Sequence, residues 1–142
     1  MKIGEVINWI GSLASIISLF LTFWIFWQIH NLKKFYVFVN RAPPLLVVIQ
    51  KQEENLSKLM IRFNNSLPRI RLELGDLRGN LLSLQTLVDR SMRRSIQHVI
   101  VLVEQYNMNQ SPGREHVVAI RAELRKVLRE VENAIEYERL VK

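Results

Sequence analysis

The chain has no cysteine among its 142 residues, and it is also poor in glycine and histidine. The missing cysteine excludes disulfide bonds, thiolate zinc sites and a thiol nucleophile. Only five glycines are present, and none belongs to a glycine-rich phosphate loop that follows a strand. The three histidines, His30, His98 and His116, are far apart and share no metal-ligand spacing. We therefore predict no metal site, no cofactor and no enzymatic activity.

The most prominent feature of the sequence is a mostly apolar run from Val6 to Ile29. As a helix, a run of this length spans about 36 Å at about 1.5 Å per residue, which is enough to cross a bilayer with some tilt. The run is too long for a cleaved signal peptide, and its small residues lie mid-run rather than after it. We therefore expect a retained membrane-spanning helix.

The charges that flank this run are unequal. Lys33, Lys34 and Arg41 follow the run, whereas Lys2 in front of it is offset by Glu5. Because positively charged flanks stay on the cytoplasmic side, the N-terminus is predicted to lie outside and the remainder in the cytoplasm. The sequence therefore predicts a single-pass protein of the inner (plasma) membrane.

Small polar side chains line one face of the apolar run. At about 100° per residue they fall within an arc of about 120°, and they are Asn8, Gly11, Ser12, Ser15, Ser18 and Thr22. A membrane anchor needs only apolar side chains, so we expect this face to contact protein or water. It either packs against neighbouring helices or lines a pore between several copies. In the pore hypothesis Phe26 and Ile29, at the cytoplasmic end of this face, form a hydrophobic gate.

The chain is predicted to divide into a transmembrane helix with a juxtamembrane extension, residues 1–41, and a basic cytoplasmic helical domain, residues 42–142. Pro43 and Pro44 mark the boundary, because the residue before a proline is pushed out of helical geometry. We expect the first helix to end before this pair. A second helix is expected to begin at Pro44, where proline suits the first helical position, and to end near Asn65.

Apolar residues spaced by three and four predict two further helices. One apolar seam runs from Ile70 to Tyr106 with a stutter near Met92, and the other lies in a helix from about Arg114 to Leu140. Breakers in the segment 107–113 separate the two helices.

Two features of the first seam leave alternatives open. Gly75 and Gly79 interrupt it, and a break there would shorten the helix to about residues 80–107. Residues 69–74 also alternate as in a β-strand, but no convincing partner strand follows. We favour a helix. The predicted fold is all-α, with one N-terminal transmembrane helix followed by a cytoplasmic bundle or coiled coil of about three helices.

Basic side chains recur at helical spacing on both seam helices, and the formal net charge is +7. Planar guanidinium groups suit phosphate recognition. The predicted anion-binding residues are Arg90, Arg93, Arg94, His98, Arg114, Arg121, Arg125 and Arg129. Aromatic stacking platforms are scarce here, so contacts with nucleic acid would be mainly to phosphates. The alternative is a solvated face balanced by nearby glutamates.

The overall plan, a polar-striped span from Val6 to Ile29 followed by a basic helical remainder, resembles the small single-span membrane effectors of bacterial antiphage defence systems. The resemblance is architectural and carries over no individual residue. It implies an effector that permeabilises the inner membrane when it is signalled.

The sequence therefore predicts a homo-oligomeric single-span membrane protein that forms a gated pore or ion channel. Its cytoplasmic helical domain would control opening through an anionic ligand, a nucleotide or oligonucleotide. The alternative is a membrane-anchored coiled-coil scaffold that binds a cytosolic partner without forming a pore. In that case the basic surface would contact anionic lipid head groups.

Overall fold

A computed structural model describes residues 2–110 and 112–141 of the chain. The elements are α1 (Ile3–Met60), a short 3-10 helix η1 (Phe63–Asn65), α2 (Leu67–Gln85), α3 (Arg90–Met108) and α4 (Arg114–Val141). The predicted all-α fold is confirmed, and the strand alternative for residues 69–74 is wrong because these residues lie inside α2. Ser111, in the segment predicted to separate the last two helices, lies outside the described residues.

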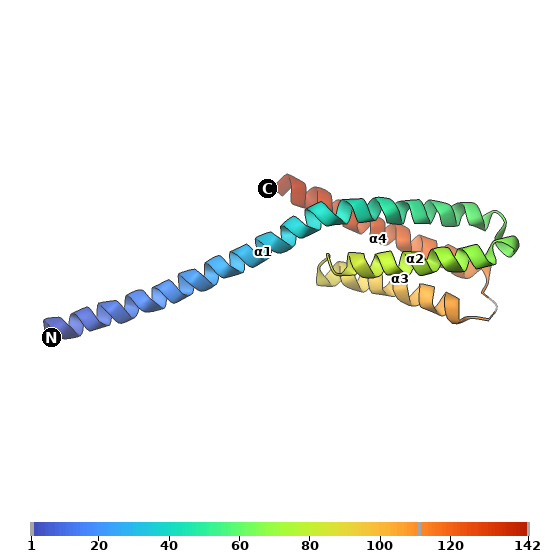
Figure 1. The fold of residues 1–142 in the computed structure, drawn as a ribbon. Coiled ribbons are helices and arrows are strands. Elements are labelled where there is room, and N and C mark those ends of the chain that lie inside the picture. The colour runs from blue at the N-terminus through green and yellow to red at the C-terminus, as the bar shows by residue number, and fades with distance from the viewer. Residues whose placement is uncertain (1, 111, 142) are drawn as a thin grey trace. The chain divides into compact units, whose positions relative to one another are not determined.

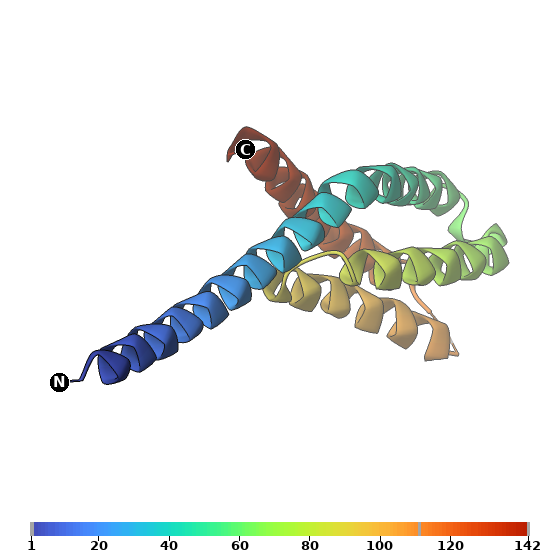
Figure 2. The same cartoon turned by 60° about the vertical axis from the view of Figure 1, so that its left-hand side comes forward.

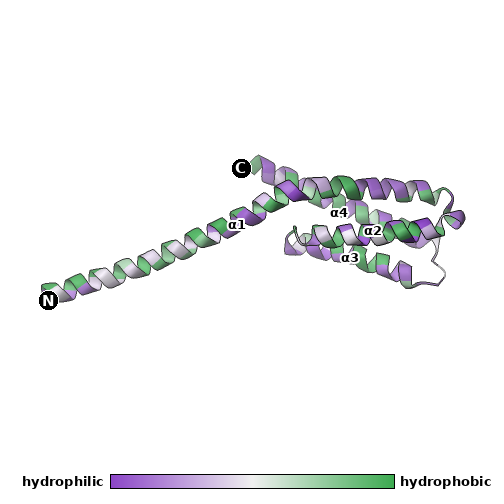
Figure 3. Ribbon diagram, viewed as in Figure 1, coloured by the Kyte–Doolittle hydropathy of each residue, from purple (hydrophilic) through white to green (hydrophobic). Residues whose placement is uncertain are grey.

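Contacts divide the chain into two units, with the boundary between Tyr36 and Val37. The sequence-based boundary was placed five residues later, between 41 and 42. In the first unit the residues are helical from Ile3 onward, and every side chain from residue 2 to residue 34 is exposed. Figure 3 shows that this part of α1 carries mostly hydrophobic and neutral residues. Its length and composition are sufficient for a membrane span.

The second unit is a four-helix bundle built from residues 37–60 of α1 together with α2, α3 and α4 (Figures 1 and 2). α2 packs against α3, and α3 packs against α4. Side-chain hydrogen bonds join α1 to both α2 and α4, for example Asn80 to Gln52 and Arg121 to Glu53. Consecutive helices run in opposite directions, as short connections require.

The predicted apolar seams form the core of this bundle. Ten residues of the first seam are buried, namely Ile70, Leu74, Leu77, Leu81, Leu84, Val88, Ile96, Val99, Val103 and Tyr106. On α4 the buried residues include Val117, Ile120, Leu124, Val127, Val131 and Ile135. Both seams face inward within one chain, so the structure shows a bundle rather than a coiled coil shared between subunits.

The prediction that a helix ends at the proline pair is wrong, because α1 continues through Pro43 and Pro44. Prolines inside a helix remove backbone hydrogen bonds and destabilise it by about 3 kcal/mol or more in isolation. Here Ala42, Leu46 and Ile49, on either side of the pair, are buried in the bundle core. This packing holds the helical backbone where local preference alone would end it.

The first seam also breaks at a place that was not predicted. The chain turns between Gln85 and Arg90, while Gly75 and Gly79 lie within α2. The Asp89 carboxylate accepts a hydrogen bond of 2.9 Å from the backbone N–H of Met92 and so caps the start of α3. One predicted helix is therefore two, and the helix expected to begin at Pro44 is instead the end of α1. Three helices, α2, α3 and α4, follow the long N-terminal helix, which confirms the predicted number of about three.

Candidate functional sites

The small polar face of the apolar segment lies along α1 with its side chains exposed. The hydroxyls of Ser12, Ser15 and Thr22 each donate to the backbone carbonyl four residues earlier, at distances of 2.9, 3.0 and 2.8 Å. These internal bonds satisfy the hydroxyl donors without any outside partner. They reduce the cost of placing the hydroxyls against hydrocarbon, so contact of this face with protein or water stays a prediction.

The remaining residues predicted for the apolar segment are Asn8, Gly11, Ser18, Phe26 and Ile29. All five are exposed on α1. The backbone carbonyls of Asn8, Gly11 and Ser18 accept the hydroxyl bonds described above. An added Cβ at Gly11 would meet no other atom within 4 Å, so the helix surface is open there. Such an open surface permits close approach of a second helix.

The predicted anion-binding residues of α3 make local contacts or remain exposed. Arg93 donates to the backbone carbonyls of Gln85 and Val88, at 3.3 and 3.5 Å, and so ties the start of α3 to the turn that precedes it. Arg90, Arg94 and His98 are exposed. No hydrogen bond or ion pair within the described residues joins this group to the arginines of α4.

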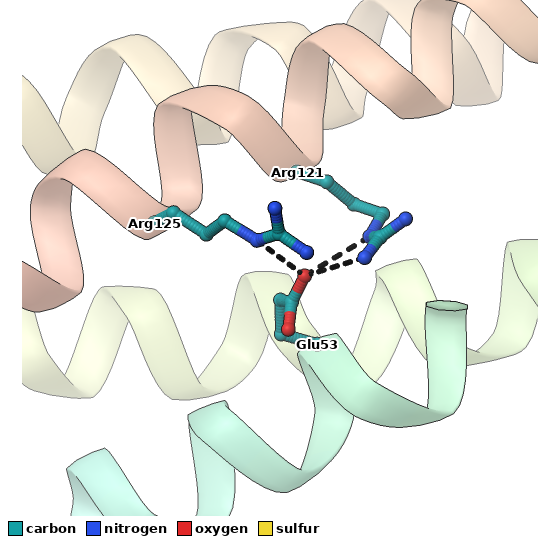
Figure 4. Close-up of polar contacts among 3 residues, drawn as sticks. All are labelled: Glu53, Arg121 and Arg125. Atoms are coloured by element: carbon teal, nitrogen blue, oxygen red, sulfur yellow. Dashed lines mark hydrogen bonds and ion pairs between the residues drawn. The ribbon is translucent and has the colours of Figure 1, made fainter. Parts of the chain in front are cut away.

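Two of the predicted arginines of α4 converge on one carboxylate of α1 (Figure 4). One oxygen of Glu53, Oε1, accepts bonds from Arg121 Nε at 3.0 Å, Arg121 Nη2 at 2.9 Å and Arg125 Nε at 3.0 Å. The side chains of Glu53 and Arg121 are 13% and 17% exposed, whereas that of Arg125 is 63% exposed. We call these three residues the Glu53 cluster. It carries one negative and two positive charges.

The other two predicted arginines of α4, Arg114 and Arg129, are exposed. Three residues before Glu53 on α1, the side-chain amide of Gln50 donates to the carboxylate of Glu132 on α4. Two hydrogen bonds join α1 to α2. Gln52 accepts one from Asn80, and the amide of Asn55 donates to Glu73 at 3.3 Å. Polar contacts therefore hold both sides of residues 37–60 of α1.

Sequence reasoning identified Arg121 and Arg125 but missed Glu53. The pairing joins residues 68 and 72 positions apart, and four-residue spacing on one helix says nothing about which helix lies opposite. A signal was present, because Glu53 follows the buried Ile49 by one turn on the flank of the predicted helix. A charge on such a flank points toward a neighbouring helix.

A groove of about 790 Å³ lies between α1 and the C-terminal end of α2. Its walls include Leu45, Val48, Leu82 and Leu87, with Arg41 among the polar residues. No group of three or more potential metal ligands is found in the described part of the chain.

Comparison of the chain with protein-family models, with curated proteins and with solved structures found no match.

Proposed function

We propose that the chain is a homo-oligomeric single-span protein of the inner membrane that forms a gated pore or ion channel. The N-terminus lies outside, and the four-helix bundle lies in the cytoplasm. An anionic ligand, a nucleotide or oligonucleotide, controls opening by binding to the arginines of the bundle. This role agrees with the architectural resemblance to small membrane effectors of antiphage defence.

The observation that carries this proposal is the continuity of α1. The same helix contains the apolar segment and Glu53, and no loop separates them. We propose that a change in the contacts of Glu53 is passed along this helix to the apolar segment that would line the pore. The polar bonds to α2 and α4 hold this helix in its present position.

Self-association is supported by the small residues of the apolar segment. Gly11 and Ser15, and likewise Ala14 and Ser18, are separated by four positions, a spacing that lets helix backbones approach closely in a membrane. Asn8 offers an amide for hydrogen bonds between helices. The bundle buries its own seams, so we place the contacts between copies in the apolar segment.

A ligand can open the assembly only by binding the open state more tightly than the closed state. Inverting a 1:99 preference for the closed state requires a difference of about 5.5 kcal/mol. Several identical sites in one oligomer would each supply part of this free energy.

Conductance of the purified full chain in planar bilayers tests the proposal. We expect discrete conductance steps, which Ser15→Leu and Ser18→Leu should reduce because leucine narrows and dries the hydroxylated face. Ile17→Leu, on the opposite face of the helix, is the matched control and should leave conductance unchanged. A wild-type chain that conducts neither alone nor with added oligonucleotide, or serine variants that conduct as well as wild type, contradicts a pore-lining role.

A scaffold without a pore is the second candidate. It is favoured by the hydroxyls that bond to their own backbone, since these tolerate hydrocarbon, and by the apolar groove between α1 and α2. Membrane potential in cells that express the full chain separates the two candidates. The pore depolarises the cells, whereas the scaffold leaves the potential intact.

A further inference from the structure

We propose that Arg121 and Arg125 form a binding site for a phosphate group and that Glu53 occupies this site from within the chain. Phosphate binding displaces Glu53 and releases α1 from α4. This inference deepens the proposed function and rests on it for the consequence of release, whereas the site itself rests on the geometry of the Glu53 cluster.

Arg121 and Arg125 carry more N–H donors than Glu53 accepts hydrogen bonds from. A guanidinium carries five N–H groups, and among the described residues the two guanidiniums make three hydrogen bonds, all to the single oxygen Oε1. Arg125 is the more exposed of the two, so its further N–H groups can donate to a ligand with more acceptor oxygens. A phosphate group presents several such oxygens and more negative charge than a carboxylate.

The net charge and the exposure of the Glu53 cluster also favour binding of an anionic ligand. The cluster has a net charge of +1, and its carboxylate and one of its guanidiniums are mostly shielded from water. Arg125 is 63% exposed, so it offers a charged group to an anion that arrives from solvent. An anion that bridges Arg125 and Arg121 replaces the carboxylate with a stronger partner.

The pair between Arg78 and Glu104 provides an internal comparison. There one arginine meets one carboxylate, at 2.8 Å between Nη2 and Oε1, and both side chains are about equally exposed, at 43% and 41%. That pair is neutral overall and joins α2 to α3, away from α1. It shows how an ordinary surface ion pair in this bundle is built, and the Glu53 cluster differs by its second arginine.

The ligand chemistry is a phosphate or phosphodiester group, which has two sources. One is a soluble nucleotide or oligonucleotide, and the other is the head group of an anionic lipid. Both present the same oxygens to the two guanidiniums, so the experiment must separate them.

Calorimetric titration of the full chain in detergent with inorganic pyrophosphate tests the site. Glu53→Gln removes the internal competitor, and we expect it to bind pyrophosphate at least tenfold more tightly than wild type. Glu104→Gln removes one carboxylate from the Arg78 pair, and it should bind within twofold of wild type. Adding Arg121→Gln to Glu53→Gln should abolish the gain.

Two results would overturn the site. Equal affinities of Glu53→Gln and Glu104→Gln would show a general charge effect only, and a gain that survives Arg121→Gln would place the anion elsewhere. If circular dichroism shows that Glu53→Gln does not fold, Arg125→Gln replaces it. That variant should weaken pyrophosphate binding at least fivefold relative to Arg139→Gln, a change at an exposed position of the same helix, and equal affinities overturn the site.

Release of α1 is tested with spin labels at Lys51→Cys and Glu130→Cys, exposed positions in a chain that has no native cysteine. In phosphatidylcholine vesicles, a longer distance on adding pyrophosphate supports a soluble ligand. A longer distance on including phosphatidylglycerol alone supports a lipid head group, and an unchanged distance in both overturns release. Neither measurement uses conductance. A chain that conducts without binding pyrophosphate loses the phosphate site and keeps the pore, and a chain that binds pyrophosphate without conducting loses the pore and keeps the site.

Discussion

At the scale of single residues, Tyr106 stands out because its polar atom is buried without a partner. Among the described residues no group bonds its hydroxyl, and the side chain is fully enclosed in the core. An unpaired buried hydroxyl costs about 1–3 kcal/mol. Tyr106→Phe is therefore expected to raise the free energy of unfolding by about 1 kcal/mol, as measured by urea denaturation. An equal or lower stability of the variant contradicts this account.

The same residue gives the bundle a pH dependence. Burial raises the pKa of Tyr106 above its usual value of 10.0, and the positive charge of Arg71 lowers it by less. Above about pH 10 the unfolded chain loses the phenolic proton while the folded chain keeps it, so stability falls as pH rises. Tyr106→Phe should lack this part of the alkaline slope. Identical slopes for the two proteins would show that burial of the phenol does not affect titration.

Arg121 is expected to stabilise the bundle more than an ordinary surface arginine does. Its side chain is 17% exposed and donates two bonds to Glu53, whereas Arg78 is 43% exposed in its pair with Glu104. Arg121→Ala should cost about 1–2 kcal/mol, and Arg78→Ala less than about 1 kcal/mol. Urea denaturation of both variants measures the difference. The reverse order contradicts a structural role for the Glu53 cluster.

Two of the three residues of the Glu53 cluster, Arg121 and Arg125, could be identified from the sequence. The four-residue step between Arg121 and Arg125 places both on one helix face whatever the tertiary fold. Their partner was not identified, because the pairing depends on which helix packs beside α4, and Glu53 precedes Arg121 by 68 positions. Charge spacing within one helix carries no information about that neighbour.

At the scale of elements, the apolar spacing predicted the buried faces of α2, α3 and α4 correctly, since burial follows helical periodicity. The predicted helix ends were wrong where tertiary packing overrides the local preference of the sequence. Val88 is buried inside the turn between α2 and α3, so the apolar repeat continues across a break in the helix. At Pro43 and Pro44 the error is the opposite one, because a helix end was predicted where the helix continues. Packing in the core holds a helix that the prolines disfavour.

Gly75 and Gly79 provide a test of local preference inside α2. Both are exposed helical residues, neither has a positive φ, and an added Cβ meets no atom within 4 Å at either position. Because alanine is preferred over glycine in helices by about 1 kcal/mol, each Gly→Ala substitution should stabilise the bundle by about that amount. The thermal midpoint measured by circular dichroism should rise for each variant and rise further for the pair. A fall in either single variant indicates an interaction at that glycine outside the bundle.

At the scale of the whole molecule, one helix links two chemically different units. Residues 2–34 present an exposed, mostly apolar surface that is long enough to cross a membrane. The second unit buries its own core and carries most of the charge. The composition of the chain already indicated this division. The continuous path of α1 between the units could not be predicted, because the proline pair argues against it.

Water accessibility of the small polar face tests the central claim most directly. Ser15→Cys and Ile17→Cys each place a single thiol in this cysteine-free chain, on opposite faces of the apolar segment. In bilayers, with the pore open, a charged thiol reagent should modify the thiol at position 15 and block conductance, and it should leave the thiol at position 17 unmodified. Equal protection of both thiols would contradict a water-lined face and the pore built on it.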